Sequence, residues 1–228
     1  MEPLVSVVIP TWNEAEAIGA VIREIPRAYV REIIIADSGS TDGTPAIAEA
    51  AGAVVIQTGR GYGRACALGA AAAHPDSQVI VFLDGDGADR GDLIARIAGP
   101  VLAGRQDLVL ASRTLGQRDP GSMHWHQVLA GRVFGFAIGA RYGTPYSDMC
   151  AFRAISRPAL AALDMREMTY GWNIEMQMKA ARARLRISEV PMPYRRRAGG
   201  TSKVAGSLGG TLRAGGKIIS TFLRVASS

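Results

Sequence analysis

Apolar runs alternate with amphipathic segments along the first half of the chain. Continuous apolar, β-branched-rich runs occur at 4–9, 31–36, 52–57, 78–83 and 107–111. Runs of this kind are typical of strands buried on both faces of a parallel sheet. Apolar residues at helical spacing, and an alanine-rich segment, predict helices over 14–25, 45–51, 65–73 and 92–102. This alternation predicts an α/β fold with a mostly parallel central sheet and helices on both faces.

The pattern changes after Arg113. A loop is expected over 115–123, and helices are expected over 126–142, 157–163 and 172–183. A strand is expected over 185–190, and an amphipathic helix over about 208–225. In that last helix Leu208, Leu212, Ile219 and Phe222 fall on one side, and Arg213, Lys217 and Arg224 fall on another. Its glycines weaken it as an isolated helix, so packing would have to support it.

Polar or glycine-rich segments follow the predicted strands at the ends where ligands of such sheets bind. They are 10–14, Asp37, the loop 59–64, Asp84 with Asp86, and Ser112 with Arg113. Together they suit one nucleotide-diphosphate ligand. Asp37 can accept a hydrogen bond from a base or ribose, and backbone N–H groups near Gly63 and Arg64 can meet phosphates.

Asp84 and Asp86 follow the buried run 79–83, with Gly85 and Gly87 beside them. Two carboxylates at one strand end are costly unless a positive charge lies between them. Mg²⁺ or Mn²⁺ is the simplest candidate, because hard cations take oxygen ligands and share them with phosphates. The alternative for this short motif is a solvated acidic turn.

Composition narrows the class of protein. The 228 residues suit one domain with an ample core, and the two cysteines form neither a disulfide framework nor a metal-ligand cluster. No signal peptide or membrane span is expected, and a reducing, cytoplasmic location fits best. The net charge of +6 is concentrated after Glu189, where seven basic residues and no acidic one occur. This segment suggests an anionic partner: phosphate groups, a membrane surface or nucleic acid.

Several classes of function are disfavoured. The loop 59–64 is not a G-x-G-x-x-G fingerprint and no Walker A motif is present, so dinucleotide and ATPase readings fail. His124 and His126 have no evident third ligand, which argues against a zinc site. Nucleic-acid binding is disfavoured because aromatic residues are few and are not interleaved with the basic run.

Four motifs, IPTWNE (9–14), ADSGSTDGT (36–44), FLDGDGAD (82–89) and ASR (111–113), resemble the donor half of family 2 glycosyltransferases with the GT-A fold. Three more, SDMCAFRA (147–154), GWNIEMQMKA (171–180) and YRRRAGGTSK (194–203), resemble the branch of dolichol- and polyprenyl-phosphate sugar synthases. The resemblance implies a GT-A domain over 1–203, with a nucleotide-sugar half to about 113 and an acceptor half from 114. Residues 204–228 then form a basic amphipathic tail on the acceptor side.

The resemblance also implies residue roles. The nucleotide would be bound by Pro10, Thr11, Glu14 and Asp37, and the metal and diphosphate would be bound by Asp84 and Asp86. Acceptor phosphate or diphosphate binding falls to Arg113, Arg132, Arg197, Ser202 and Lys203. Trp172 and Glu175 match an aromatic-x-x-Glu near the sugar and acceptor, and Ala88 stands where many members have Gln. We expect the catalytic set to be Asp86, Asp148, Glu175 and Arg113.

Purely structural roles are the alternatives for several of these residues. Asp37 could cap a turn, Asp148 could be a turn residue or a general base, and Glu175 could begin a helix. Arg195–Arg197 could be a solvated charge run, although arginine forks match phosphate well.

The leading hypothesis is a metal-dependent transferase that moves a hexose from a UDP-glucose or GDP-mannose type donor to a polyprenyl phosphate. It would act at the inner membrane face through peripheral attachment, and a homodimer is compatible with it. A soluble hydroxyl acceptor, or a binding module for nucleotide sugars or anionic lipids without turnover, are the alternatives.

Overall fold

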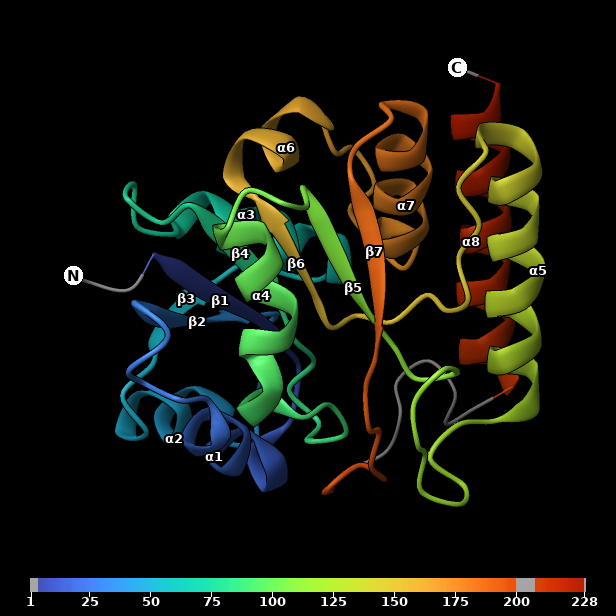
Figure 1. The fold of residues 1–228 in the computed structure, drawn as a ribbon. Helices are drawn as coiled ribbons and strands as arrows, with labels where there is room; N and C mark the ends of the chain where they lie inside the picture. The colour runs from blue at the N-terminus through green and yellow to red at the C-terminus, as the bar shows by residue number, and fades with distance from the viewer. Residues whose placement is uncertain (1–3, 200–207, 228) are drawn as a thin grey trace.

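A seven-stranded sheet forms the centre of the molecule (Figure 1). The structure, a computed structural model, describes residues 4–199 and 208–227. The strand order is β3-β2-β1-β4-β6-β5-β7, and only β6 runs antiparallel to its neighbours. The strands are β1 (Val5–Thr11), β2 (Glu32–Asp37), β3 (Val54–Gln57), β4 (Val79–Phe82), β5 (Leu108–Ser112), β6 (Arg153–Ser156) and β7 (Ile187–Pro191). The mostly parallel sheet expected from the apolar runs is confirmed.

Helices cover both faces of the sheet, as expected (Figure 1). Helices α1 (Ala15–Glu24), α2 (Thr44–Ala50) and α4 (Ile94–Leu102) pack on one face, where the short 3₁₀ turn η1 (Gly91–Leu93) leads into α4. On the other face lie α3 (Tyr62–Ala72), α6 (Arg157–Ala162) and α7 (Trp172–Arg182). Helices α5 (Trp125–Tyr142) and α8 (Leu208–Ala226) stand beside α7 at one end of the sheet.

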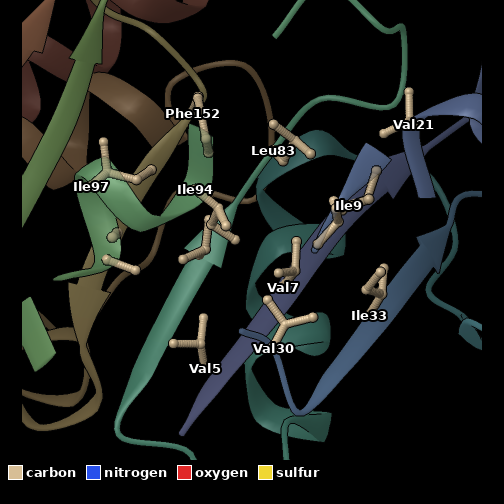
Figure 2. Packing of buried hydrophobic residues seen from close by; sticks show 14 of the residues in the cluster. Val5, Val7, Ile9, Val21, Val30, Ile33, Leu83, Ile94, Ile97 and Phe152 are labelled. Carbon is tan, nitrogen blue, oxygen red and sulfur yellow. The ribbon is translucent and has the colours of Figure 1, made fainter. Parts of the chain in front are cut away.

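The alternation along β1 divides the core into two clusters. Val5, Val7 and Ile9 face the side of the sheet that α1, α2 and α4 cover, which Figure 2 shows at close range. Val8 faces the opposite cluster, which includes Phe82 of β4. Successive side chains of a strand point to opposite faces, so one apolar run supplies both clusters. Burial of each such side chain contributes about 1.5–3 kcal/mol before entropy is counted.

Strand β6 was not predicted from the sequence. It has four residues, RAIS, and pairs antiparallel with β4 and β5. Its first residue, Arg153, is fully buried, and its guanidinium donates to the backbone carbonyls of Cys150 and Asn173. A buried arginine interrupts the apolar pattern that identifies the other strands, so the sequence gives little signal here.

The loop expected at 59–64 is shorter than predicted, because α3 begins at Tyr62. Gly61 has φ +127°, a conformation that glycine adopts readily. Gly63 lies against the backbone carbonyl of Glu167, where a Cβ atom would collide. Gly63 therefore serves a close approach of two backbones within the first turn of α3.

The predicted C-terminal helix is confirmed as α8, while residues 204–207 of the predicted tail lie outside the described residues. Its buried side chains are those of Ala214, Thr221 and Val225, whereas Leu212 and Ile219 are exposed. Two residues of the predicted apolar side therefore face solvent, whereas Phe222 of the same side packs against the ring of Phe134. Among the described helices, none has the length and apolar character needed to cross a bilayer.

Candidate active site

Asp84 and Asp86 lie at the carboxyl end of β4 and line the floor of a large cavity. Gly85 packs against the side chains of Thr11 and Ile9, and Gly87 has φ +78°, so the chain turns sharply here. One oxygen of Asp86 accepts a hydrogen bond of 2.9 Å from the backbone N–H of Ala88. The backbone at the Ala88 position thus helps to hold the second carboxylate of the motif.

Burial and a neighbouring carboxylate disfavour the charged form of Asp84. Burial and the neighbouring charge of Asp86 raise the pKa of Asp84 to about 7. The hydroxyl of Tyr62 donates to it over 3.3 Å, a long hydrogen bond. Burial and the charges of Asp84 and Asp86 also raise the pKa of Asp89 well above its usual value. This end of β4 therefore concentrates negative charge that a divalent cation would stabilise.

The segment 195–198 runs along the turn that carries Asp84 and Asp86, here called the D-x-D motif. The backbone N–H of Arg195 donates to the carbonyl of Ala88, and the N–H of Ala198 donates to the carbonyl of Asp86. This pairing brings a guanidinium nitrogen of Arg197 to 2.9 Å from Asp86, while the other terminal nitrogen lies 3.1 Å from Glu14. One arginine thus bridges Asp86 and the loop after β1.

Arg113 follows β5 and meets Asp148 in a two-pronged ion pair. Its Nε and Nη2 atoms donate to the two oxygens of Asp148, each over 2.7 Å. The backbone N–H of Arg113 adds a third hydrogen bond of 3.0 Å. Burial alone would raise the pKa of Asp148, but the charge and hydrogen bonds of Arg113 outweigh it, and the pKa is lowered. Asp148 is therefore an ionised partner that fixes the Arg113 guanidinium.

The cavity has a volume of about 770 Å³ and two contrasting parts. Carboxylates and arginines gather at the strand ends, while small and apolar side chains line the part between α5, α7 and α8. The polar part includes Thr11, Glu14, Arg60, Asp84, Asp86, Arg113 and Arg197, and the apolar part includes Ala130, Met149, Ala151, Ile174, Ala214 and Ile218. Such a space suits a charged donor beside an acceptor that carries apolar groups.

Comparison with known proteins identifies the family. The model for "Glycosyl transferase family 2" matches residues 6–163. The chain belongs to glycosyl transferase family 2. Within this family, an uncharacterized glycosyltransferase of Mycobacterium tuberculosis is 35% identical over 212 residues, covering 91% of this chain and 93% of the relative. The dolichyl-phosphate hexose transferase of Haloferax volcanii is 34% identical over 200 residues, covering 86% of this chain and 85% of the relative.

A solved structure supports the GT-A fold of this family 2 glycosyltransferase. The chain superimposes on glucosyl-3-phosphoglycerate synthase of Mycobacterium tuberculosis, solved with Mn²⁺, UDP and glucosyl-3-phosphoglycerate, with a TM-score of 0.79. The two are 26% identical, and the match covers 99% of this chain and 80% of the other. The fold and family expected from the seven motifs are confirmed.

The end of β1 and the loop after it carry three of the predicted nucleotide-side residues of the glycosyltransferase. Pro10, Thr11 and Glu14 line the cavity. Asp37 lies beside them but is fully buried. Its carboxylate accepts hydrogen bonds from the backbone N–H groups of Gly39 and Ser40, and from two hydroxyls. In this structure Asp37 caps the turn after β2, which was the structural alternative to its predicted role in nucleotide binding.

Several other predicted site residues are not among the cavity-lining residues of the described chain. Gly63 packs against backbone, Arg64 is exposed on α3, and Arg132 is exposed on α5. Trp172 is buried and meets Phe82 edge to face, with ring centroids 6.0 Å apart. Its neighbours Asn173 and Ile174 line the cavity instead. Ser202 and Lys203 lie outside the described residues.

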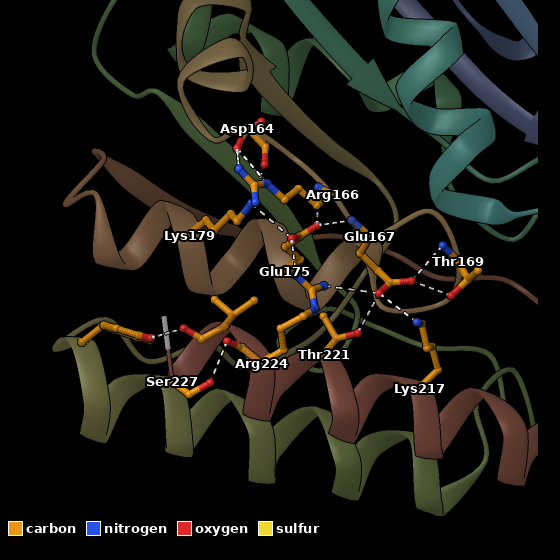
Figure 3. A network of polar contacts seen from close by, with 12 residues as sticks. Asp164, Arg166, Glu167, Thr169, Glu175, Lys179, Lys217, Thr221, Arg224 and Ser227 are labelled. Carbon is orange, nitrogen blue, oxygen red and sulfur yellow. Dashed lines mark hydrogen bonds and ion pairs between the residues drawn. The ribbon is translucent and has the colours of Figure 1, made fainter.

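Glu175 is the centre of a buried polar network beneath α8 (Figure 3). One oxygen accepts hydrogen bonds from the backbone N–H groups of Arg166 and Glu167, over 3.0 and 2.7 Å. The other lies 3.1 Å from the Lys179 amine and 3.3 Å from Arg224 of α8. Glu175 therefore fixes the segment 164–171, whose residues Thr169 and Tyr170 line the cavity.

Sequence reasoning missed several cavity-lining residues, above all Arg60 and Trp12. The Arg60 guanidinium stacks over the Trp12 ring, 3.6 Å from its centroid. The predicted phosphate-binding loop 59–64 did contain a cavity-lining arginine. Because α3 begins at Tyr62, however, Arg60 and Gly61 line the cavity, and the predicted Gly63 and Arg64 do not. An arginine held flat on an aromatic ring keeps its donors free for a phosphate at its edge.

Proposed function

We propose that this glycosyltransferase moves a hexose from a nucleotide-diphosphate sugar of the UDP-glucose or GDP-mannose type to a polyprenyl phosphate. One observation carries the proposal: three carboxylates, among them the pair Asp84 and Asp86, and three arginines converge on one cavity whose other walls are largely apolar. Carboxylates suit a metal-bound diphosphate, arginines suit phosphate oxygens, and apolar walls suit a prenyl chain.

The residues present fit a divalent cation. Asp84 and Asp86 would hold it, because they form an acidic pair in which, among the described residues, Asp84 accepts one long hydrogen bond. Two carboxylates leave coordination positions for diphosphate oxygens and water, which is how Mg²⁺ and Mn²⁺ are commonly bound in such sites. When bound, the ion would supply Lewis-acid stabilisation of the departing nucleoside diphosphate.

The arginines of this chain would complete the charge balance. An acceptor phosphate oxygen attacks C1 of the hexose, and the bond from C1 to the β-phosphate oxygen breaks. The leaving diphosphate takes the electron pair of that bond, and Arg60 and Arg197 are placed at the polar wall where this charge grows. Arg113, held by Asp148, would orient the acceptor phosphate. Fixed donors of this kind stabilise charge without reorganising during the reaction.

The state of the candidate bases favours a phosphate acceptor over a hydroxyl acceptor. Asp148 is committed to Arg113, and its pKa is lowered. Glu175 is fully buried and engaged with backbone N–H groups and two cations. A phosphate acceptor is already anionic near neutral pH, so neither carboxylate needs to remove a proton. The relationship to a dolichyl-phosphate hexose transferase points the same way.

A second candidate is transfer to a small soluble acceptor. It is favoured by the likeness to glucosyl-3-phosphoglycerate synthase, which was solved in complex with Mn²⁺, UDP-glucose and phosphoglyceric acid. The variant Asp148→Asn does not separate the two candidates. It removes the charge that holds Arg113, so both candidates predict a loss of activity.

Separate incubations with the two kinds of acceptor test the proposal. The protein is incubated with UDP-[¹⁴C]glucose or GDP-[¹⁴C]mannose, Mn²⁺, and either a polyprenyl phosphate in detergent or 3-phosphoglycerate. We expect label in the organic phase with the lipid acceptor, and little aqueous product with phosphoglycerate. Aqueous product alone would reject the lipid acceptor while keeping the transferase. No transfer from either donor to either acceptor would reject the proposal.

A further inference from the structure

Helices α5 and α8 form a paired surface beside the cavity. They lie side by side along their lengths (Figure 1), with the rings of Phe134 and Phe222 5.6 Å apart between them. Near the end of the pair, the Tyr142 hydroxyl lies 3.5 Å from the backbone carbonyl of Val225. The two helices therefore pack together on this side of the molecule, and their exposed sides are here called the α5–α8 face.

This face exposes an unusual amount of apolar side chain. Trp125 and Phe136 of α5 are each 76% exposed, and Leu212 of α8 is 68% exposed. Seven of the eleven exposed large apolar residues in the described chain belong to these two helices: Trp125, Leu129, Val133, Phe136, Leu212, Ile219 and Leu223. Their spacing places each set on one side of its helix, away from the core. A patch of this kind marks an interaction surface.

The charges of the α5–α8 face have one sign. Neither helix contains an aspartate or a glutamate. Arg132 and Arg141 of α5 and Arg213 of α8 are exposed, while Lys217 and Arg224 reach the buried carboxylate of Glu167. Apolar side chains flanked by arginines are typical of helices that lie in the headgroup region of an anionic bilayer.

The same charges argue against a second copy of the chain as the occupant. In a two-fold dimer through this face, each patch would meet its own copy. The exposed arginines would then face arginines, with no acidic side chain on either helix to compensate. An anionic membrane supplies the opposite charge over the whole face.

The two helices of the α5–α8 face also form part of the cavity wall. His126, Gln127 and Ala130 of α5 and Ala214, Gly215 and Ile218 of α8 line the cavity from the inner side of the same two helices. The helices that carry the exposed apolar side chains therefore also border the space where an acceptor phosphate would bind.

We infer that the α5–α8 face docks on the surface of an anionic lipid bilayer and presents the cavity to a membrane-borne acceptor. The docking itself is independent of turnover, but the delivery of an acceptor rests on the proposed function. The helices would lie in the interface with Trp125 and Phe136 as the deepest side chains, since aromatic rings favour that zone.

Vesicle flotation tests the docking. Wild-type protein is mixed with phosphatidylcholine vesicles, or with vesicles containing 30% phosphatidylglycerol, at low salt and at 0.5 M salt. We expect binding to the anionic vesicles at low salt and weaker binding at high salt. The variant Trp125→Glu/Phe136→Glu should lose binding at least tenfold. The matched control, Val54→Glu/Leu68→Glu, changes exposed apolar residues elsewhere and should bind like wild type.

A milder variant and two further readouts keep the test decisive. Brominated lipids should quench wild-type tryptophan fluorescence, and Trp125→Phe should remove most of that quenching while keeping vesicle binding. Transfer to a short-chain, water-soluble prenyl phosphate should be unchanged in Trp125→Glu/Phe136→Glu, while transfer to a long polyprenyl phosphate in vesicles falls at least tenfold.

Three results would overturn the inference. They are equal vesicle binding by the Trp125→Glu/Phe136→Glu variant, absence of wild-type binding to anionic vesicles, and a wild-type dimer that this variant dissociates. Vesicle binding without any transfer to prenyl phosphates would instead reject the proposed acceptor and leave the docking surface in place.

Discussion

A guanidinium nitrogen of Arg197 lies 2.9 Å from a carboxylate oxygen of Asp86, at the position where a metal ligand is expected. The same side chain donates to both oxygens of Glu14 over 3.1 Å. Arg197 thus neutralises one of the two acids of the D-x-D motif. A divalent ion bound through this oxygen of Asp86 would compete with Arg197, which would then be released toward the diphosphate.

Removing Arg197 should therefore tighten binding of the ion alone. In Arg197→Ala without nucleotide, we expect Mn²⁺ to bind about tenfold more tightly, because loss of a charge-assisted hydrogen bond is worth about 1.5–3 kcal/mol. Titration calorimetry measures this. Arg196→Ala is the matched control, since Arg196 contacts Asp119 and Pro120 rather than the motif. Unchanged or weaker Mn²⁺ binding in Arg197→Ala would contradict the competition.

The raised pKa of Asp84 predicts a pH dependence of stability in the ion-free protein. Its pKa is about 7 in the folded state, against an ordinary value of 3.8. Between these values the folded state binds a proton that the unfolded state has released, so stability falls as pH rises from about 4 to 7 and then levels off. Urea unfolding at several pH values should show this fall in wild type.

The variant Asp84→Asn supplies the comparison, because it removes this titration while keeping the shape of the side chain. We expect the stability difference between wild type and Asp84→Asn to change across pH 5–7, and Mn²⁺ to reduce the wild-type slope. Parallel stability curves for the two proteins would contradict the raised pKa.

The pair of Arg113 and Asp148 should behave as one unit in folding. Asp148→Ala leaves a largely buried guanidinium without its carboxylate and should lower the free energy of unfolding by about 3–5 kcal/mol. Asp148→Ala combined with Arg113→Ala should cost less than the sum of the single variants, which urea unfolding can measure. Additive losses would show that the two side chains do not depend on each other.

Glu175 should affect stability more than chemistry. Glu175→Ala removes the acceptor for two backbone N–H groups and the partner of Lys179, so we expect a loss of about 3–5 kcal/mol in unfolding free energy. At a temperature where the variant stays folded, kcat should remain within about tenfold of wild type, well short of the loss expected for a missing catalytic group. Asp164→Asn, at an exposed carboxylate of the same network, should change little. Full stability with a thousandfold loss of kcat would make Glu175 a catalytic residue.

The sequence predicts those parts of the fold that have a clear pattern of apolar residues or polar residues at the end of a strand. The apolar run before Asp84 and Asp86 identified β4, and the rule that ligands bind at carboxyl strand ends placed both acids in the cavity. Strand β6 was missed because its buried Arg153 breaks the apolar pattern. Its role depends on pairing with two distant strands, which no local signal reveals.

A site residue could be predicted from the sequence where its chemistry suits one environment. It could be predicted less well where the direction of the side chain determines whether the residue lines the cavity. Trp172 and its neighbour Asn173 occupy the first turn of α7, yet only Asn173 points into the cavity while Trp172 packs on Phe82. Asp148 could be placed at the site, but its commitment to Arg113 required the geometry. The sequence showed that α8 is amphipathic, but not which face it would turn to solvent.

The central claim is that Asp84 and Asp86 hold a divalent ion that bridges to the donor diphosphate. A crystal grown with Mn²⁺ and UDP or GDP, with diffraction recorded at the manganese absorption edge, tests it most directly. We predict one strong anomalous peak within bonding distance of an Asp84 or Asp86 carboxylate oxygen and of a diphosphate oxygen, with Arg197 moved off Asp86. A nucleotide bound with its manganese peak elsewhere, or with Arg197 still on Asp86 and no ion at the pair, would contradict the account.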